Sequence, residues 1–210
     1  MTIEKEKFTA ICLSLLLMQL ALLTKTFPLY EVWTQIPLFH IDNAAHWYQI
    51  TVAINLAEQG QHIGYDPFFN AGTSAGVIHN PGAKLPALLG SLLPLPATPI
   101  QLWKFYVFAA ASIAAVCMPI GAKLLNRGNW TIAASGILGL LLWWVSLFRW
   151  FHTAGMVSFV LASYLSIPYI GLIYRYFNER NSLTYLIGLC VFGAIGFYIH
   201  PLFPLPVACW

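Results

Sequence analysis

The sequence predicts an all-α fold, a polytopic bundle of transmembrane helices, and three observations lead to this prediction. Hydrophobic residues occupy 59% of the 210 positions, and the mean hydropathy is +0.72. Charged residues make up only 8% of the chain, whereas a soluble domain carries roughly 25%. Apolar runs recur that approach the roughly 20 residues a helix needs to cross a bilayer. Because so little of the chain can face water, a soluble domain is excluded.

The apolar runs place five crossings in one transmembrane domain that covers residues 1–210. The first run follows the charged segment MTIEKEK, and no small-residue cleavage motif comes after it, so an uncleaved signal-anchor helix is expected. The later runs are bounded by the polar segments KLLNRGN, RWFHTAG and RYFNERN. The predicted crossings are 8–27, 99–122, 130–149, 156–177 and 184–208. Because the chain stops inside an apolar segment, we expect it to be the N-terminal part of a longer protein.

Between the first two crossings lies a long outer loop, 28–98, which is expected to be structured. An amphipathic helix is predicted over 43–59, because Gly60 ends the pattern. A segment rich in Gly, Asn and Pro follows, and loops of that length are usually functional or disordered. The apolar piece 84–95 is short and interrupted by prolines, so it is predicted to be a re-entrant or interfacial helix and not a crossing.

The basic residues orient the bundle. With the N-terminus in the cytoplasm and no crossing at 84–95, the residues expected inside are Lys5, Lys7, Lys123, Arg127, Arg175 and Arg180. A crossing at 84–95 would move the last two basic loops outside, against the positive-inside tendency. The same topology puts all six histidines on the outer side. Side chains suited to catalysis and binding are therefore predicted to gather at one face of the membrane.

The segment HIDNAAHW, residues 40–47, is the first candidate site. Asp42 precedes a helical run, so its carboxylate is expected either to cap that helix or to act as a base or metal ligand. Taken alone, its position favours the cap, and the two roles can coexist. His46 lies four residues later on the same side of the predicted helix, where it either faces water or contacts a substrate. The pattern does not match H-E-x-x-H, which argues against a zinc hydrolase.

Further candidates for substrate binding lie in the other outer segments. Tyr65 and Asn70 belong to the long loop, where aromatic rings and amides suit a carbohydrate or a lipid headgroup; an ordinary polar connector is the alternative. Arg149 and His152 fall in a predicted short loop, where the arginine either snorkels at a helix end or pairs with a phosphate. His200 stands in an apolar run and is either a functional residue at membrane depth or an interfacial one.

Taken in order, these motifs resemble a known family. The D-x-x-x-H helix start, the helix that ends at Gly60, and the segments YDPFFNAG and NPGAKLPALLGSLLP are similar to the first half of the GT-C superfamily of polytopic glycosyltransferases. The nearest pattern in that superfamily is the 6-pyruvoyl-tetrahydropterin synthase-related membrane-protein domain. The resemblance covers roughly residues 8–205 and is strongest over 38–95. These residues give no reason to expect pterin chemistry.

The resemblance implies a GT-C-like fold and the transfer of a sugar from a polyprenyl-phosphate-linked donor to an acceptor on the outer face. By position, Asp42 corresponds to the family's acidic residue, which acts as a base or as a ligand of a divalent cation, Mg or Mn. The second outer loop often adds another acid, but here it reads RWFH. That departure argues against a metal-dependent mechanism and leaves Arg149 and His152 to hold the donor phosphate.

The resemblance also implies the partners and the location. The bilayer and the lipid-linked sugar donor are the expected partners, and no nucleic acid is expected. The implied location is the bacterial inner (plasma) membrane, with the N-terminus cytoplasmic and the first loop periplasmic or extracellular.

Two other functions stay open at this point. The first is a non-catalytic integral membrane component of envelope or polysaccharide assembly or transport. A transporter would more naturally show internal repeats and ionisable residues inside its helices. The sequence shows no repeat, and the predicted helix interiors lack Asp and Glu, which weakens a transporter but not a scaffold. The second is a fragment without activity.

Overall fold

A computed structural model describes residues 2–78, 82, 84–93, 96–178 and 182–203. His79, Pro94 and Arg180, on which parts of the sequence-based predictions rest, lie outside these residues. The elements in chain order are α1 (Thr2–Thr26), η1 (Leu29–Trp33), α2 (Asn43–Glu58), β1 (Gly64–Asp66), β2 (Thr73–Ala75), α3 (Lys84–Leu92), α4 (Pro99–Leu124), α5 (Asn129–Val145), α6 (Leu147–Thr153), α7 (Val157–Asn178) and α8 (Leu183–Ile199).

The long helices confirm the predicted class of mostly helical membrane protein. Three of them, α1, α4 and α7, are long and apolar enough to cross a membrane. A fourth span requires α5 and α6 together, and these two helices meet at a bend of 57°. The remaining apolar helix, α8, has only 17 residues. Three to four candidate spans are therefore found among the described residues, and the chain is an integral membrane protein.

Two predicted crossings have the wrong bounds. The helix predicted over 130–149 ends at Val145, because Ser146 adopts an extended backbone and its hydroxyl oxygen accepts a hydrogen bond from the amide of Phe148. Arg149 and His152 therefore lie on the short helix α6, not in a loop. The helix predicted over 184–208 ends at Ile199, because His200 precedes Pro201, and a residue before proline disfavours the helical conformation. Residues 204–208 of that prediction lie outside the described part.

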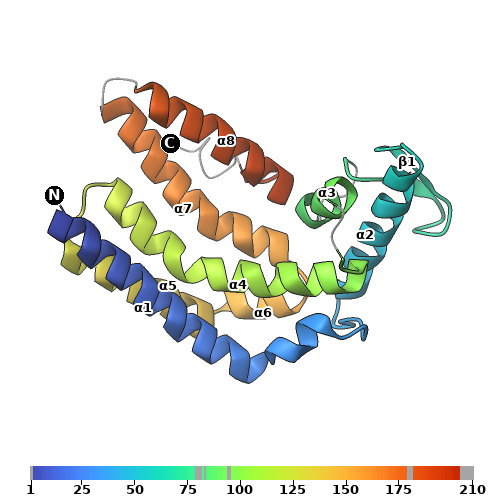
Figure 1. Ribbon diagram of the computed structural model, residues 1–210, viewed down its shortest axis with the longest axis horizontal. Helices are drawn as coiled ribbons and strands as arrows, with labels where there is room; N and C mark the ends of the chain where they lie inside the picture. The colour runs from blue at the N-terminus through green and yellow to red at the C-terminus, as the bar shows by residue number, and fades with distance from the viewer. Residues whose placement is uncertain (1, 79–81, 83, 94–95, 179–181, 204–210) are drawn as a thin grey trace.

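Helix α4 is the centre of the bundle. It packs against α1 and α5 on one side and against α7 on the other, with α8 beyond α7 (Figure 1). Small residues let α4 and α7 approach closely. A Cβ atom added at Gly121 would lie 2.7 Å from Cγ2 of Ile167, and one at Gly171 would lie 2.6 Å from Cβ of Leu124. Such close contacts supply the van der Waals attraction that holds helices together in lipid.

The helices divide the molecule into two ends. The N-terminus of α1, the connection from α4 to α5 and the start of α8 lie at one end (Figure 1). The described residues between 28 and 98, helix α6 and the end of α8 lie at the other, which we call the loop end. Helix α2 runs across the direction of the long helices there. The described parts of the predicted outer segments therefore lie at the same end of the bundle.

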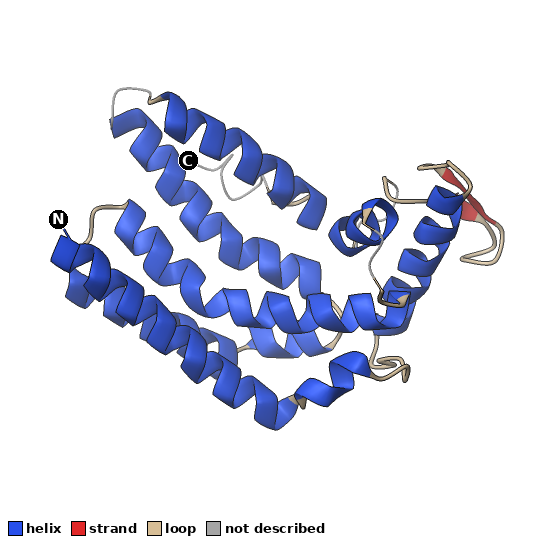
Figure 2. Cartoon of the chain, in the orientation of Figure 1, coloured by secondary structure: helices blue, strands red, loops and turns tan. Residues whose placement is uncertain are grey.

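A small β-hairpin within the loop end was not predicted. Strands β1 and β2 pair antiparallel, with Gly64 opposite Ala75 and Asp66 opposite Thr73 (Figure 2). Each strand has only three residues, too few to produce a recognisable alternation of apolar and polar residues. The short helix α3 covers most of the predicted 84–95 segment.

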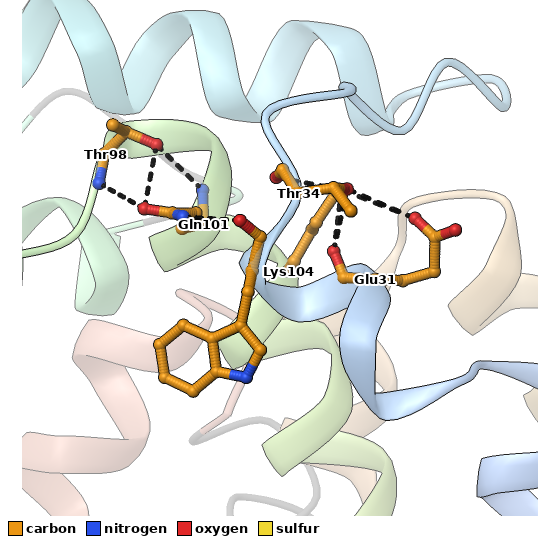
Figure 3. Close-up of polar contacts among 6 residues, drawn as sticks. Glu31, Thr34, Thr98, Gln101 and Lys104 are labelled. Atoms are coloured by element: carbon orange, nitrogen blue, oxygen red, sulfur yellow. Dashed lines mark hydrogen bonds and ion pairs between the residues drawn. The ribbon is translucent and has the colours of Figure 1, made fainter.

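Buried Lys104 fastens the start of the loop to α4. Its ammonium group donates to the backbone carbonyls of Glu31 and Thr34 at 2.8 and 3.2 Å, and lies 3.8 Å from the Glu31 carboxylate (Figure 3). One turn earlier, Gln101 completes a capping box with Thr98 and donates from its amide to the carbonyl of Trp33 at 2.7 Å. Segment η1 is therefore held against the first two turns of α4.

Buried Gln19 joins three helices inside the bundle. Its amide donates to the carbonyl of Ala111 on α4 at 2.9 Å, and its side-chain oxygen accepts from the indole of Trp144 on α5 at 2.7 Å. Within an apolar surrounding, such bonds replace those that water would otherwise make.

We expect Gln19→Leu to destabilise the protein by about 1–2 kcal/mol, because the substitution leaves the indole N–H of Trp144 without its acceptor. The midpoint of thermal unfolding in detergent measures the effect. Met18→Leu, at a neighbouring position that is 46% exposed, is the control and should leave the midpoint nearly unchanged. Equal midpoints for the two variants would contradict the assigned role of Gln19.

Candidate functional site

A cavity of about 570 Å³ opens at the loop end, between α1, α4, α5, α6 and the segment that leads into α2. We call it the loop-end pocket. Its lining residues are Leu23, Thr26, Phe27, Leu38, Phe39, His40, Asn43, Val107, Phe108, Ala111, Trp143, Trp144, Ser146, Arg149, Trp150, His152 and Thr153. Six of them are Phe or Trp, so the walls are rich in aromatic rings. Such walls with a few polar groups are typical of small-molecule sites.

Asn43 fixes the wall that α2 contributes. The side chain is 3% exposed, and its amide nitrogen donates to the carbonyls of His40 at 2.7 Å and Thr153 at 3.1 Å. Its amide oxygen accepts from the indole of Trp103 on α4 at 3.0 Å. The neighbouring backbone N–H of Asp42 donates to the carbonyl of Ala154 at 2.9 Å. The start of α2 is thereby held to both α4 and the end of α6.

Arg149 supplies the positive charge of the pocket. It lies on α6, is exposed, and its guanidinium lies 5.3 Å from the centre of the Trp144 ring. Stacking on an aromatic face orients the guanidinium without using its N–H donors. These donors are suited to a phosphate or carboxylate at the rim. His40, also exposed, lines the pocket as well.

His152 lies at the buried part of the pocket and has a different role from the one predicted. It is 5% exposed, its Nε2 is 2.9 Å from the carbonyl of Val107, and its ring meets Trp143 edge-on. A carbonyl can only accept, so Nε2 carries the proton, and in the neutral ring Nδ1 is an acceptor. An acceptor does not bind a phosphate anion. The prediction that His152 helps Arg149 hold the donor phosphate is therefore wrong.

Asp42 lies beside the pocket but does not line it. Its side chain makes no capping hydrogen bond, because its backbone is already helical, at φ −81° and ψ −8°. The interpretation as a helix cap is therefore wrong, and no donor to the carboxylate is found among the described residues. The Asp42 side chain packs near Gly155, where an added Cβ would lie 2.9 Å from the Cβ of Asp42. The carboxylate is partly exposed and available to a ligand.

His46 lies one turn after Asn43 on α2 and, like Asn43, contacts Trp103 on α4, but it does not line the pocket. Its ring centre lies 4.8 Å from that of Trp103, and a Cβ at Gly82 would lie 2.2 Å from Cε1 of the imidazole. Its Nδ1 is buried and has no hydrogen-bond partner in the described part of the chain. The interpretation as a water-facing interfacial residue is therefore wrong, and the ring instead joins α2 to α4.

Three other predicted substrate-binding residues lie outside the pocket. Tyr65 is 66% exposed on β1, and Asn70 is in the hairpin turn, where its φ is +50°. That turn folds back along α2, with Phe69 stacked on Tyr48. His200 ends α8, where its ring packs against Phe159 and its Nδ1 accepts from the amide of Leu202. The hairpin residues therefore form a separate surface, and His200 has a local structural role.

The pocket also contains residues that were not predicted as site residues. Asn43 was only the first residue of the predicted amphipathic helix, and Trp143 and Trp144 were only part of a predicted crossing. Adjacent tryptophans at the end of an apolar run, followed closely by an arginine, are a sequence signal that could have indicated them.

A metal site built from protein ligands alone is not found in the described residues, where no three His, Cys, Asp or Glu side chains are grouped to hold an ion. Asp42 is a single carboxylate, whereas Mg²⁺ is commonly bound by one or two carboxylates together with substrate phosphates. No step is therefore assigned to a metal.

Comparisons of the chain with protein-family models, with curated proteins and with solved structures found no match. The resemblance to the GT-C superfamily is neither supported nor opposed by these comparisons.

We expect the free energy of unfolding to depend on pH through His46. Burial lowers the pKa of this imidazole below its usual 6.5, and the charge of Asp42 and the backbone of Gly155 only partly oppose the shift. The unfolded chain therefore takes up a proton near pH 6.5 that the folded protein does not, and stability falls as the pH drops below that value.

Chemical unfolding at about pH 7.5 and about pH 5.5 measures this dependence. The loss of stability on acidification should be smaller in His46→Phe, which keeps an aromatic ring against Trp103. His62→Phe, at an exposed histidine, is the control. An unchanged pH dependence in His46→Phe would show that another group is responsible.

Proposed function

We propose that this protein is a GT-C-type membrane glycosyltransferase that binds a polyprenyl-phosphate-linked sugar at the loop-end pocket and transfers the sugar to an acceptor on the outer face. The observation that carries the proposal is an aromatic cavity with a cation at its exposed rim, placed at the end of a bundle of apolar helices. A membrane-bound sugar phosphate needs these three features together: aromatic surfaces for the sugar ring, positive charge for the phosphate, and a bilayer for the prenyl chain.

The pocket suggests how the donor lies. The phosphate contacts the guanidinium of Arg149 at the rim, and the sugar enters the aromatic cavity. The prenyl chain then extends into the bilayer along exposed apolar side chains of this region, Phe39, Val145, Leu147 and Trp150, which are 52–78% exposed. In this arrangement the anomeric carbon lies just inside the rim.

Asp42 is placed to act as the general base. In the reaction, an acceptor hydroxyl oxygen forms a bond to the anomeric carbon while the bond from that carbon to the phosphate oxygen breaks. Asp42 takes the hydroxyl proton, and Arg149 offsets the charge left on the polyprenyl phosphate. The support for this role is that Asp42 adjoins Asn43, which lines the pocket, and that its carboxylate has no donor among the described residues.

The topology belongs to the same proposal. Five crossings require the bent pair α5 and α6 to act as one span and the short helix α8 to act as another. The loop end then faces the periplasm or the exterior of a bacterial inner membrane, and the N-terminus faces the cytoplasm. The predicted excess of Lys and Arg at the opposite end supports this orientation.

A non-catalytic component of envelope or polysaccharide assembly is the second candidate. The observation that favours it is that no carboxylate of the described residues lines the pocket. Under this alternative the pocket holds a lipid-linked sugar, and Asp42 has no part in a reaction.

We expect Arg149→Gln to weaken the binding of a short isoprenyl phosphate about tenfold or more, because a charge-assisted hydrogen bond is lost. Quenching of intrinsic tryptophan fluorescence in nanodiscs measures the affinity. Arg127→Gln, at an exposed arginine of the opposite end, should bind as the unchanged protein does. Equal affinities for the two variants would contradict the placement of the phosphate.

We expect Asp42→Asn to lower the rate of sugar transfer about 10²–10⁴-fold and to leave the binding of isoprenyl phosphate unchanged. Transfer is measured as the release of polyprenyl phosphate from a sugar-bearing polyprenyl phosphate in membranes that contain the protein. Near-normal release in the variant would exclude Asp42 as the base. If the unchanged protein binds the lipid but releases no polyprenyl phosphate, the non-catalytic function is the correct one.

A further inference from the structure

The deepest part of the loop-end pocket contains two buried aromatic side chains that the proposed chemistry does not use. Trp143 on α5 is 2% exposed and His152 on α6 is 5% exposed, and both line the cavity. Their ring centres lie 4.9 Å apart at an interplanar angle of 66°. The bend between α5 and α6 places the two rings against each other. We call this pair the pocket floor.

The floor has an unused hydrogen-bond donor. The indole Nε1–H of Trp143 is buried and has no acceptor within the described part of the chain. The adjacent Trp144 differs, because its Nε1–H donates to Gln19 at 2.7 Å. Buried polar groups of folded proteins almost always have a partner, so an unpaired donor on a side chain that lines a cavity needs an explanation.

The floor also has an acceptor. The Nε2–H of His152 donates to the carbonyl of Val107 at 2.9 Å. Within the described part of the chain, no carboxylate that could stabilise an imidazolium lines the pocket, and burial disfavours the charged ring. The neutral ring therefore presents Nδ1 as a lone-pair acceptor. A donor and an acceptor on rings whose centres lie 4.9 Å apart match a group that can both accept and donate, which a hydroxyl does and a phosphodiester or a prenyl chain does not.

We propose that the pocket floor recognises a sugar hydroxyl: the indole N–H of Trp143 donates to the hydroxyl oxygen, and the hydroxyl donates to Nδ1 of His152. This inference rests on the proposed function, because it assigns the sugar of the lipid-linked donor to the interior of the pocket and its phosphate to the rim. The floor then distinguishes the loaded donor, which carries a sugar, from the spent polyprenyl phosphate, which does not.

The test compares two ligands and one substitution. Isoprenyl phosphate and the same isoprenyl phosphate bearing one glucose are titrated against the protein in nanodiscs. Trp143→Phe keeps an aromatic ring and removes only the N–H. Because that N–H has no acceptor among the described residues, its loss breaks no known bond of the fold. Trp33→Phe, at a 70% exposed tryptophan outside the pocket lining, is the matched control.

Trp143→Phe should weaken binding of the glucose-bearing lipid about three- to tenfold and leave binding of isoprenyl phosphate unchanged, as one hydrogen bond is lost. Trp33→Phe should change neither affinity. An unchanged preference for the glucose-bearing lipid in Trp143→Phe would overturn the inference and indicate that the indole binds an ordered water only. The proposed phosphate site would survive that result.

Two further outcomes are informative. One shows whether the hydroxyl belongs to the donor sugar or to the acceptor sugar, and the other distinguishes a failure of this inference from a failure of the proposed function. Free methyl glucoside is titrated as a third ligand, and a loss for this ligand alone would assign the floor to the acceptor sugar. That result would overturn the donor assignment. Failure of the unchanged protein to bind either isoprenyl phosphate would contradict the proposed function itself.

Discussion

The hydrogen bonds of Asn43 are the interaction on which the loop-end pocket depends. One side chain, 3% exposed, joins the turn before α2, the end of α6 and the indole of Trp103 on α4. Two donors and one acceptor are satisfied by groups from three separate segments, so the position of α2 is set by geometry and not by apolar contact alone. Without it, the segment 38–43 would keep the backbone bond from Asp42 to Ala154 but lose three side-chain bonds, which weakens one wall of the pocket.

Two kinds of contact likewise hold the rest of the bundle together. Close approach of small residues holds α4 to α7, while a few buried polar side chains set which surfaces meet. Gln19 does this for α1, α4 and α5, and Lys104 does it for η1 and α4. In an apolar surrounding a polar side chain is costly without its partner, so each such contact favours a single arrangement of the helices.

The long apolar helices were the part of this structure that could be predicted from the sequence. Apolar runs located α1, α4 and α7 closely, because crossing a bilayer requires length and apolarity that composition reveals directly. The bend at Ser146 and the end of α8 were missed, because both depend on single residues. The site was harder to predict. Arg149 and His152 both line the loop-end pocket, but they lie on a short helix and not in the predicted loop. The burial of His152 and of the His46 imidazole was not predicted. Their burial follows from contacts with Val107 and Trp103, residues far away in the sequence, which no local pattern contains.

The central claim is that Asn43 holds α2 in place as a wall of the ligand pocket. Amide hydrogen exchange of Asn43→Ala in nanodiscs, compared with the unchanged protein, tests it most directly, because exchange reports local opening segment by segment. The account predicts faster exchange in the first turns of α2 and in α6, with the middle of α4 and α7 still protected. Unchanged protection of α2 in the variant would contradict the account, because some other contact would then position that wall.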